Sequence, residues 1–326
     1  MSVLVTGGAG FIGSVVADQL RAHGEQVVII DDLSRGHREV VDSDVPFYQD
    51  AVGDTEAVTR IVEEQKVDAC IHFAGLIAVG ESVAEPALYW RRNVAESISL
   101  FETLSNLGVE NAVFSSSVAV YGDPIEVPIP EDHPKAPTSP YGNTKLVVEM
   151  VLEDLSAAGR LRAVSLRYFN AAGATDRRRE RHDPETHLIP LALRAARQGT
   201  PMMVFGTDWP TPDGTAVRDY IHVSDLASAH VRAIDYLHGG GPTIALNLGV
   251  GHGASVREVL TTAEAVTGMP IDAVETPRRA GDPAVLVASA GRAGEVLDWS
   301  PQTTNLGDII ESAWHWESSG PPSQQD

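Results

Sequence analysis

The sequence predicts an α/β fold: a doubly wound parallel sheet followed by a smaller, irregular C-terminal lobe. In the first half of the 326-residue chain, apolar runs alternate with helical patterns; the runs cover residues 3–5, 27–30, 67–73, 111–117 and 162–168. Unbroken apolar strands separated by helices are typical of a parallel sheet covered on both faces. After Asn170 proline, glycine and other loop signals become more frequent, so we expect a second lobe there. Helical patterns in this second half of the chain lie near 188–198, 224–237, 255–267 and 305–316, and we expect the chain to return to the sheet near 221–226 and 244–249.

The composition excludes several classes of function. The net charge of -21 argues against nucleic acid as a partner, because binding it depends on lysines and arginines that neutralise phosphates. The single cysteine, Cys70, allows no internal disulfide and fits a reducing compartment. No stretch approaches the roughly 18 apolar residues of a membrane span, and MSVLVTGGAG is expected to be a first strand, not a signal peptide. We therefore predict a cytoplasmic protein that does not bind membranes.

A glycine-rich loop follows the first predicted strand and opens a helix. In VLVTGGAGFIGS the glycines Gly7, Gly10 and Gly13 recur at every third position. Such glycines permit a tight turn and a close backbone approach to a pyrophosphate, and the helix N-terminus contributes amide donors. The motif is weak alone, but its place at the first strand–helix junction of an α/β chain favours a Rossmann-type dinucleotide site.

Two adjacent acids end the second predicted strand, in VVIIDDLS. Asp31 lies eighteen residues after Gly13, and a carboxylate there can accept hydrogen bonds from both ribose hydroxyls while repelling a 2′-phosphate. NAD is therefore favoured over NADP. The pattern leaves open whether Asp31 or Asp32 bonds the ribose, and we choose Asp31. Asp50, after the third strand, is a candidate for bonding the adenine amino group.

The stretch SPYGNTK, residues 139–145, places a tyrosine and a lysine four positions apart. Ser139 and Pro140 have the pattern of an N-cap and a first-turn proline, so Tyr141 and Lys145 are expected one turn apart on one helix face. Moving a tyrosine pKa from about 10 to near 7 requires roughly 4 kcal/mol of preferential stabilisation of the phenolate. A nearby ammonium, a pyridinium and a helix N-terminus can together provide it in a desolvated cleft. The spacing also occurs by chance on many helices, so it indicates catalysis only in combination with other features.

The fourth long strand ends in three serines, in FSSSVAVYG. A hydroxyl at this end faces the crevice outside the carboxyl edge of the sheet, where doubly wound folds bind ligands. Ser117 is our candidate, although serines at strand ends commonly bond the local backbone.

The glycine loop, ribose acid, strand-end serine and Tyr-x-x-x-Lys, in this order, resemble the extended short-chain dehydrogenase/reductase family. Longer motifs narrow the resemblance to the UDP-glucose 4-epimerases, from the start of the chain to about residue 316: FAGLIAVGES, FSSS, SPYGNTK, SLRYFN, DGTAVRDYIHV and PRRAGD. The resemblance implies an NAD-binding Rossmann domain at 1–169 plus about 221–247 and a nucleotide-sugar-binding lobe at about 170–220 plus 248–317. The composition of the tail, SSGPPSQQD at 318–326, predicts disorder. The family resemblance also implies a homodimer formed through helices at about 86–107 and 140–157; the apolar residues of LYWRRNVAESISLFETL suit such an interface and equally suit a role in the core alone.

The resemblance implies a reaction and a role for each site residue. Tyr141 would take the proton of the sugar 4-hydroxyl while hydride leaves C4 for NAD, Lys145 would hold the nicotinamide ribose and lower the tyrosine pKa, and Ser117 would bond the sugar oxygen. The 4-keto sugar, anchored by its UDP, would then rotate and take the hydride back on its opposite face. The implied cofactor residues are Gly7, Gly10, Phe11, Ile12, Gly13, Asp31, Asp32, Asp50, Ala51, Phe73, Ala74, Gly75, Ser117, Tyr141, Lys145 and Phe169. The implied substrate residues are Ser117, Tyr141, Asn170, His187, Leu188, Phe205, Arg218, Tyr220, Arg279, Asp282 and Leu286.

Several positions depart from the family pattern. Ile77 stands where relatives often have a lysine and Arg92 where they have an asparagine, so two contacts with NAD are in doubt. Ala119 replaces a common threonine. Leu286 stands where some relatives have a tyrosine near the sugar 2-position, so some tolerance of UDP-N-acetylhexosamines is expected.

Other functions and sites remain to be weighed. A sugar-nucleotide 4,6-dehydratase needs an acid beside the serine position, where this chain has Val118 and Ala119. A non-catalytic dinucleotide sensor would use the same fold, which by itself does not distinguish these functions. The scattered histidines, His182 and His187 among them, predict no metal site. The charged stretch RRRERHD, residues 177–183, is expected to be a solvated loop face.

Overall fold

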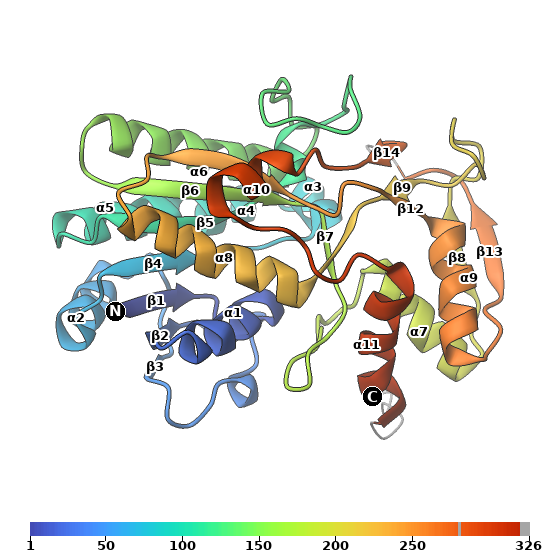
Figure 1. Ribbon diagram of the computed structural model, residues 1–326, viewed down its shortest axis with the longest axis horizontal. Helices are drawn as coiled ribbons and strands as arrows, with labels where there is room; N and C mark the ends of the chain where they lie inside the picture. The colour runs from blue at the N-terminus through green and yellow to red at the C-terminus, as the bar shows by residue number, and fades with distance from the viewer. Residues whose placement is uncertain (280–281, 320–326) are drawn as a thin grey trace.

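A seven-stranded parallel sheet forms the centre of the computed structural model, which describes residues 1–279 and 282–319 (Figure 1). The strand order is β11-β6-β5-β4-β1-β2-β3. These strands are β1 (Ser2–Thr6), β2 (Gln26–Ile30), β3 (Phe47–Tyr48), β4 (Ala69–His72), β5 (Asn111–Ser117), β6 (Arg162–Tyr168) and β11 (Ile244–Leu248). All of their pairings are parallel, so the predicted fold class is confirmed.

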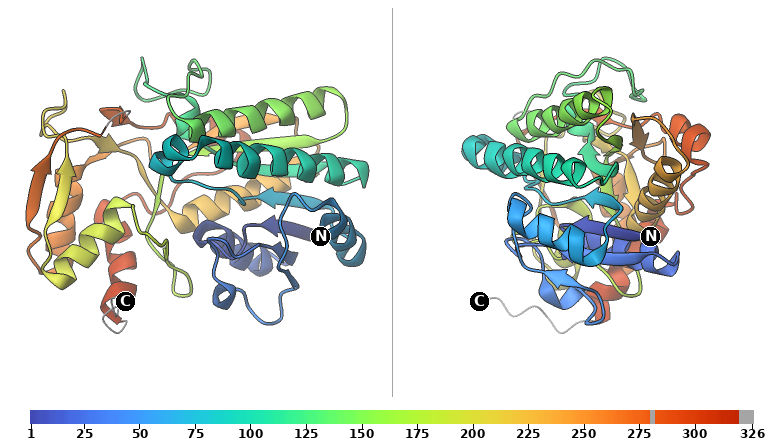
Figure 2. Two further views of the ribbon diagram at one scale, coloured as in Figure 1. Left: turned by 180° about the vertical axis from the view of Figure 1, so that it is seen from behind. Right: turned by 90° about the vertical axis from the view of Figure 1, so that its left-hand side faces the viewer.

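Helices cover both faces of this sheet, as the end-on view in Figure 2 shows. One face carries α1 (Phe11–Ala22), α8 (Val223–His238) and α10 (Gly291–Leu297), and the other α2 (Thr55–Gln65), α5 (Glu96–Asn106) and α6 (Pro140–Ala157). Side chains alternate along each strand, so Val3 and Val5 of β1 belong to the core under α1 and α8, whereas Leu4 belongs to the core on the other face. Shorter helical segments precede α5: α3 (Val79–Ala84), α4 (Pro86–Tyr89) and a π-helical turn, Trp90–Ala95.

The strand order reverses at β1, because β2 lies on one side of it and β4 on the other. Two glycines let the loops at this point pack closely. Gly7 has a positive φ of 68°, and a Cβ there would lie 2.7 Å from the amide nitrogen of Ala74, just after β4. A Cβ at Gly13 would lie 2.4 Å from the carbonyl oxygen of Gly7. Doubly wound sheets bind ligands at this switch point, outside the carboxyl ends of the strands.

The second lobe has its own small core. The helices α7 (Leu188–Gln198), α9 (Val256–Thr267) and α11 (Leu306–Ser319) pack together around apolar residues such as Ile189, Val259 and Ile309. Short strands surround them: β8 (Met202–Phe205) pairs with β13 (Ala273–Thr276), and β9 (Val217–Arg218) lies between β12 (Ala254–Ser255) and β14 (Val285–Leu286). The four helical patterns expected in the second half are thus present, the last as far as residue 319; residues 320–326 of the predicted tail lie outside the described residues.

The chain returns to the main sheet at one of the two predicted places. Residues 244–248 form the edge strand β11, as expected, but the prediction for 221–226 is wrong. β10 (Tyr220–His222) pairs instead with β7 (Asn170–Ala172) in a separate two-stranded sheet between the lobes. The strand is short because the His222 side chain accepts a hydrogen bond from the Ser224 amide and so caps α8, which starts at Val223.

Candidate active site

The start of α6 places the tyrosine and lysine of the SPYGNTK motif. Ser139 is the N-cap, its Oγ accepting a hydrogen bond from the Gly142 amide at 3.1 Å, and Pro140 is the first helical residue. Both features were predicted and are confirmed. Tyr141 and Lys145 therefore lie one turn apart, and the Lys145 Nζ is 5.8 Å from the centre of the Tyr141 ring.

The end of β5 brings a serine to this pair. Ser117 is the last residue of β5, and its hydroxyl lies close enough to the Tyr141 phenol to lower the pKa of that phenol. The Ser117 Oγ also accepts from the Ala119 amide at 3.2 Å, at the start of a 3-10 turn, Val118–Val120. The Lys145 Nζ donates to the carbonyl oxygen of Ser115 at 2.8 Å, which fixes the ammonium beside the same strand end. The structure thus brings together the three residues for which sequence analysis predicted catalytic roles.

Burial dominates the electrostatics of these groups. It raises the pKa of the Tyr141 phenol above its usual value, and the nearby Ser117 hydroxyl opposes part of that rise. Burial also lowers the pKa of Lys145 to about 8, although the negative charge of Glu149 acts in the opposite direction. These protein groups alone therefore keep the phenol protonated, and a lower tyrosine pKa requires further positive charge in the cleft.

Next to Lys145 lies a buried ion pair between Glu149 and Arg167, which sequence analysis missed. Glu149, one turn after Lys145 on α6, is 2% exposed and accepts from Arg167 of β6 at 2.6 Å. Its carboxylate also accepts from the Ser116 hydroxyl at 2.5 Å, and Arg167 donates to the Tyr121 hydroxyl at 2.8 Å. The available signal was an arginine inside an otherwise apolar strand, because a buried charge needs a partner.

A cleft of about 530 Å³ runs along the carboxyl edge of the sheet from this site to the glycine loop. It is lined by fourteen of the sixteen predicted cofactor residues: Gly7, Gly10, Phe11, Ile12, Gly13, Asp31, Asp32, Asp50, Phe73, Ala74, Gly75, Ser117, Tyr141 and Phe169. Ala51 is not part of the lining, and Lys145 lies behind it, 4% exposed. Sequence analysis missed other lining residues, including Ser115 and Tyr168, whose hydroxyls bond each other.

The two acids after β2 have different partners. Asp31 is 7% exposed, and its carboxylate accepts from the backbone amides of Ala9 at 3.0 Å and Leu33 at 2.9 Å. Burial raises its pKa and those backbone bonds partly offset the rise. Asp32 instead forms an ion pair with Arg92; burial raises its pKa, but the hydrogen bonds from Ser34 and Arg92 outweigh burial and lower it overall.

The cleft fits a dinucleotide. The α1 helix begins at Phe11 with no side chain capping its first turn, so its amides are available to a pyrophosphate. A Cβ at Gly13 would lie only 2.4 Å from the carbonyl oxygen of Gly7, so no side chain fits where the loop turns into the helix. Asp31 lies at the end of the adjacent strand, where a ribose acid is expected. The residues present can therefore hold NAD along this edge.

The predicted substrate residues form two groups. Six of the eleven line a cavity. Ser117, Tyr141, Asn170 and His187 line the main cleft, and Asn170 and His187 also line a smaller adjoining cavity of about 60 Å³ together with Leu188 and Tyr220. The other five lie further into the second lobe and do not line either cavity: Phe205, Arg218, Arg279, Asp282 and Leu286.

The second group is held together by charge and ring contacts. The Arg279 guanidinium carbon lies 3.9 Å from the centre of the Phe205 ring, and Arg218 donates to Asp282 at 3.2 Å. Leu286 of β14 pairs in register with Arg218 of β9. Two arginines thus lie in one small region of an acidic protein, and guanidinium groups suit phosphate oxygens.

The charged stretch at 177–183 is not simply a solvated face, so that prediction is wrong. Arg178 is only 9% exposed and lines the main cleft, and Arg177 and Arg178 both pair with acids of the first half of the chain. Sequence reasoning could not see this, because the partners are Asp18 and Asp42, more than 130 residues away along the chain.

Three residues of the same loop region could place metal-ligating atoms within 4.8 Å of one another: Glu180, His182 and His187. Each is already engaged: the Nδ1 of His182 lies 2.6 Å from Glu180, and that of His187 lies 2.8 Å from Glu185. Burial lowers the pKa of His187, but the hydrogen bond with Glu185 and the charges of Glu180 and Glu185 outweigh it and raise the pKa overall. These local bonds account for the positions of the side chains.

A glycine loop at the switch point, an acid after β2 and a Ser-Tyr-Lys set at the end of β5 define a dinucleotide-dependent enzyme. Residues 3–249 match the model of the NAD dependent epimerase/dehydratase family, and the chain belongs to that family. Its curated relatives include the UDP-glucose 4-epimerase of Lacticaseibacillus casei, 44% identical over 98% of both chains.

Solved structures agree with this. The UDP-glucose 4-epimerase of Brucella ovis in complex with NAD is 43% identical, with a TM-score of 0.94 over 97% of this chain and 98% of that one. The enzyme of the same name from Stenotrophomonas maltophila, with bound NAD and formylated UDP-arabinopyranose, is 40% identical, with a TM-score of 0.95 over 98% of both chains.

Proposed function

We propose that this chain interconverts UDP-galactose and UDP-glucose through a transient 4-keto sugar, with NAD held in the main cleft. One observation carries the proposal: Tyr141, which lies beside the Ser117 hydroxyl and one turn from Lys145, lines the same cleft as the glycine loop and Asp31. The reaction is an isomerisation, because the hydride removed from the sugar returns to it.

Each residue of the Ser-Tyr-Lys set has a role in this reaction. Bound NAD provides a hydride acceptor for C4 of the sugar. Tyr141 takes the proton of the 4-hydroxyl, and Ser117 bonds the sugar oxygen and helps pass the proton. Lys145 holds the nicotinamide ribose. The keto sugar rotates about its anchored UDP, and Tyr141 then returns the proton as the hydride reaches the opposite face of C4.

The electrostatics of the cleft support a base that acts only when the cofactor is present. Burial raises the pKa of Tyr141 in the protein by itself, so the phenol is a poor base there. The positive charge of a pyridinium, added to the Lys145 ammonium, favours the phenolate. Because the pKa of Tyr141 is raised in the protein by itself, efficient proton removal requires oxidised NAD in the cleft.

The arginine group of the second lobe is suited to anchor the UDP. Arg218 and Arg279 offer guanidinium donors to diphosphate oxygens. At present Arg218 pairs with Asp282, whose side chain is 41% exposed. Asp282 can therefore turn into solvent when a diphosphate takes its place. Asn170 and Leu188, which line the smaller cavity beside the main cleft, are suited to contact the nucleotide.

A second substrate class is suggested by one position. Leu286 lies beside Arg218 and is smaller than the tyrosine of some relatives, which leaves room near the sugar 2-position. We therefore expect some turnover of UDP-N-acetylglucosamine as well. Complete absence of turnover with this substrate would overturn the idea without affecting the main proposal.

Two competing functions have less support. A 4,6-dehydratase must expel the 6-hydroxyl with an acid beside the serine, but Val118 and Ala119, which follow Ser117, carry none. A non-catalytic sensor has no need of a tyrosine, serine and lysine arranged as in this cleft. Under the sensor function, Tyr141→Phe would keep full biological activity.

The direct test is to incubate the protein with UDP-galactose, without added NAD, and to resolve the products by chromatography. We expect UDP-glucose to form until equilibrium, without lasting accumulation of NADH. Supplying NAD in a parallel reaction separates loss of cofactor during purification from absence of activity. No UDP-glucose in either reaction would overturn the proposal.

The assembly and setting of the enzyme form part of the same proposal. We infer a homodimer through α5 and α6, which lie side by side on the outer face in the left view of Figure 2. Large apolar side chains are exposed on these helices and on the turn before α5: Trp90 of the turn is 40% exposed, Ile98 of α5 39% and Met150 of α6 53%. A second copy is the occupant expected from the family resemblance, and light scattering tests it.

Within the described residues no helix is long and apolar enough to cross a bilayer. From the family resemblance we place the enzyme in the cytoplasm, in galactose metabolism.

The division into two lobes is likewise proposed. Residues 1–169 plus about 221–247 would bind NAD, and about 170–220 plus 248–317 would bind the nucleotide sugar. The separate cores support it, because α7, α9 and α11 pack around a cluster of their own.

A further inference from the structure

The loop between β7 and α7 reaches from the second lobe back to the first. In Figure 1 it is the yellow-green segment that runs down beside α1. We call its residues 177–183 the strap. Arg177, Arg178 and Glu180 of the strap line the main cleft together with Gly10 and Phe11 of the glycine loop. The strap thus forms one wall of the cleft that holds the dinucleotide.

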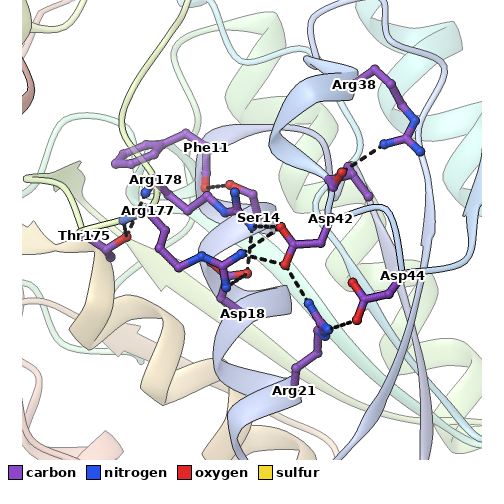
Figure 3. A network of polar contacts seen from close by, with 11 residues as sticks. Phe11, Ser14, Asp18, Arg21, Arg38, Asp42, Asp44, Thr175, Arg177 and Arg178 are labelled. Carbon is purple, nitrogen blue, oxygen red and sulfur yellow. Dashed lines mark hydrogen bonds and ion pairs between the residues drawn. The ribbon is translucent and has the colours of Figure 1, made fainter. Parts of the chain in front are cut away.

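Ion pairs fasten the strap at one end, as Figure 3 shows. The Arg178 Nη2 lies 2.8 Å from Asp18 of α1 and 3.1 Å from Asp42, which follows β2. The Arg177 Nη2 lies 2.6 Å from Asp42. The hydrogen bond from Arg177 is the largest influence on Asp42, and with Arg178 it lowers the pKa of that carboxyl to about 2. Asp42 therefore stays ionised at any physiological pH.

The other end of the strap is fastened to the loop after β2. Arg181 pairs with Glu39 at 2.8 Å, and the Arg181 carbonyl oxygen lies 3.0 Å from the Nε2 of His37. Arg35 donates to the carbonyl oxygen of Asp183 at 3.4 Å. Arg35, His37 and Glu39 also line the cleft, so both loops close over the same space.

The base of the strap is held by the second lobe. The Arg178 amide donates to the Thr175 hydroxyl at 2.9 Å, and the Trp316 indole of α11 donates to the Thr175 carbonyl at 2.6 Å. The Arg179 guanidinium carbon lies 5.6 Å from the centre of the Trp316 ring. The strap therefore leaves the cleft only by breaking charged contacts with the first lobe, while its base stays fixed.

Arg178 has a donor to spare. The side chain is 9% exposed, it lines the cleft, and its buried Nε has no hydrogen-bond partner among the described residues. A buried donor without a partner is unfavourable unless a ligand or water accepts from it. The pyrophosphate of a dinucleotide at the start of α1 is such an acceptor. Ile77, which lines the same cleft, is uncharged and cannot donate a hydrogen bond to the pyrophosphate.

We propose that the strap retains the dinucleotide, and that Arg178 both fastens the strap and donates to the diphosphate of bound NAD. This rests on the proposed function only in requiring that NAD occupies the cleft. Release of NAD then requires the ion pairs with Asp18 and Asp42 to break. Retention should depend on ionic strength, because salt at about 1 M shortens the Debye length to about 3 Å.

The test measures NAD release from the purified, NAD-loaded protein. A glycohydrolase that consumes free NAD makes release irreversible, and the NAD that remains bound is quantified by chromatography after denaturation. We expect Arg177→Ala to release NAD about 5-fold faster than the unaltered protein at low salt, and Arg178→Gln about 10-fold faster or more. At about 1 M salt the unaltered protein should approach the Arg177→Ala rate.

Arg232→Ala is the matched control. Arg232 is 50% exposed, close to the 55% of Arg177, and its pair with Asp298 lies away from the strap. Its loss changes the net charge equally, so its release rate should equal that of the unaltered protein. Asp42→Asn removes the shared acid and should match Arg177→Ala or exceed it. Thermal unfolding shows whether Arg178→Gln folds. If it does not, Arg177→Ala and Asp42→Asn, at two partly exposed positions, still test whether the strap retains NAD.

Unchanged release rates in both Arg177→Ala and Asp42→Asn would overturn the proposal. So would a rate in the unaltered protein that does not respond to salt. The assay contains no sugar, so a protein that holds NAD but does not epimerise refutes the proposed function and leaves the strap test valid. A protein that takes up no NAD refutes both.

Discussion

The two parts of the candidate site are built differently. At the edge of the sheet, Ser117, Tyr141 and Lys145 are placed by a strand end and a helix start, and Lys145 is 4% exposed. In the second lobe, Arg218 and Asp282 face each other across an ion pair whose acid is 41% exposed. Backbone geometry therefore fixes the first part, whereas side-chain charges in contact with water fix the second.

This difference separates chemistry from anchoring. A buried group keeps one geometry and has a strongly perturbed pKa, which suits proton transfer. An exposed ion pair contributes little and exchanges partners easily, which suits a diphosphate that must enter and leave. Substitutions at the sheet edge should therefore change kcat or stability, and substitutions in the second lobe should change KM.

The largest expected effect is that of Tyr141→Phe. Removing the hydroxyl removes the proposed proton acceptor, so kcat should fall by about 10²–10⁴-fold, the usual contribution of general acid–base catalysis. The conversion of UDP-galactose to UDP-glucose, followed by chromatography, measures it. Bound NAD and the thermal midpoint should stay close to those of the unaltered protein, because the ring still packs in the cleft. A variant with near-normal kcat would show that another group is the base.

The sequence predicted the sheet edge better than the second lobe, for a physical reason. Gly7, Ser117 and Tyr141 lie at strand ends or helix starts, and a parallel sheet brings such positions to one edge whatever the loops do. The strap is different, because Arg178 is placed by Asp18 and Asp42, and nothing in a run of arginines reveals distant partners. The roles of the substrate residues came from resemblance alone.

The next effect concerns the ion pair behind Lys145. Glu149 and Arg167 are both buried, and breaking a buried pair by neutralising one partner costs about 3–5 kcal/mol of unfolding free energy. Glu149→Gln should therefore lower the urea midpoint strongly. Glu153→Gln, one turn further along α6, is the control: Glu153 is 56% exposed and its contact with Lys135 is 4.0 Å long, so the midpoint should change little.

The same variant also tests the pKa of the lysine. Glu149 raises the pKa of Lys145, opposing the burial that lowers it to about 8, so loss of that negative charge should move the pKa below 8. If the ammonium is required, activity is present below this pKa and is lost as pH rises through it. The alkaline limb of the pH–rate profile should therefore shift to lower pH in Glu149→Gln and stay in place in Glu153→Gln. A shift in the opposite direction would contradict the assignment of the limb to Lys145.

A smaller effect is expected in the arginine group of the second lobe. Arg218→Lys keeps the charge but loses the planar fork that suits phosphate oxygens, so KM for UDP-galactose should rise about 10-fold with little change in kcat. Initial-rate kinetics at two salt concentrations measure both. Arg194→Lys, on the exposed surface of α7, should change neither constant. A fall in kcat of the same size as the rise in KM would mean that Arg218 acts on the transition state, and the separation of chemistry from anchoring would fail.

The smallest effect is expected at Arg92 and Asp32, which form a partly exposed ion pair beside the buried edge of the sheet. Arg92 pairs with Asp32 and, at 3.0 Å, with Glu96, and all three side chains line the cofactor cleft at 22–28% exposure. If the arginine only neutralises these acids, Arg92→Asn leaves carboxylates facing a diphosphate and should weaken NAD binding a few-fold, about 1 kcal/mol at most.

A double substitution separates neutralisation from direct contact with NAD. Replacing Asp32 by Asn as well removes the acid that Arg92 neutralises, so the Asp32→Asn/Arg92→Asn protein should recover most of the lost affinity. Titration calorimetry with NAD on the cofactor-stripped protein gives the coupling energy of the pair. If Arg92 instead contacts the cofactor itself, the loss should persist in the double variant. The coupling energy between the two substitutions therefore decides whether Arg92 neutralises Asp32 or contacts NAD directly.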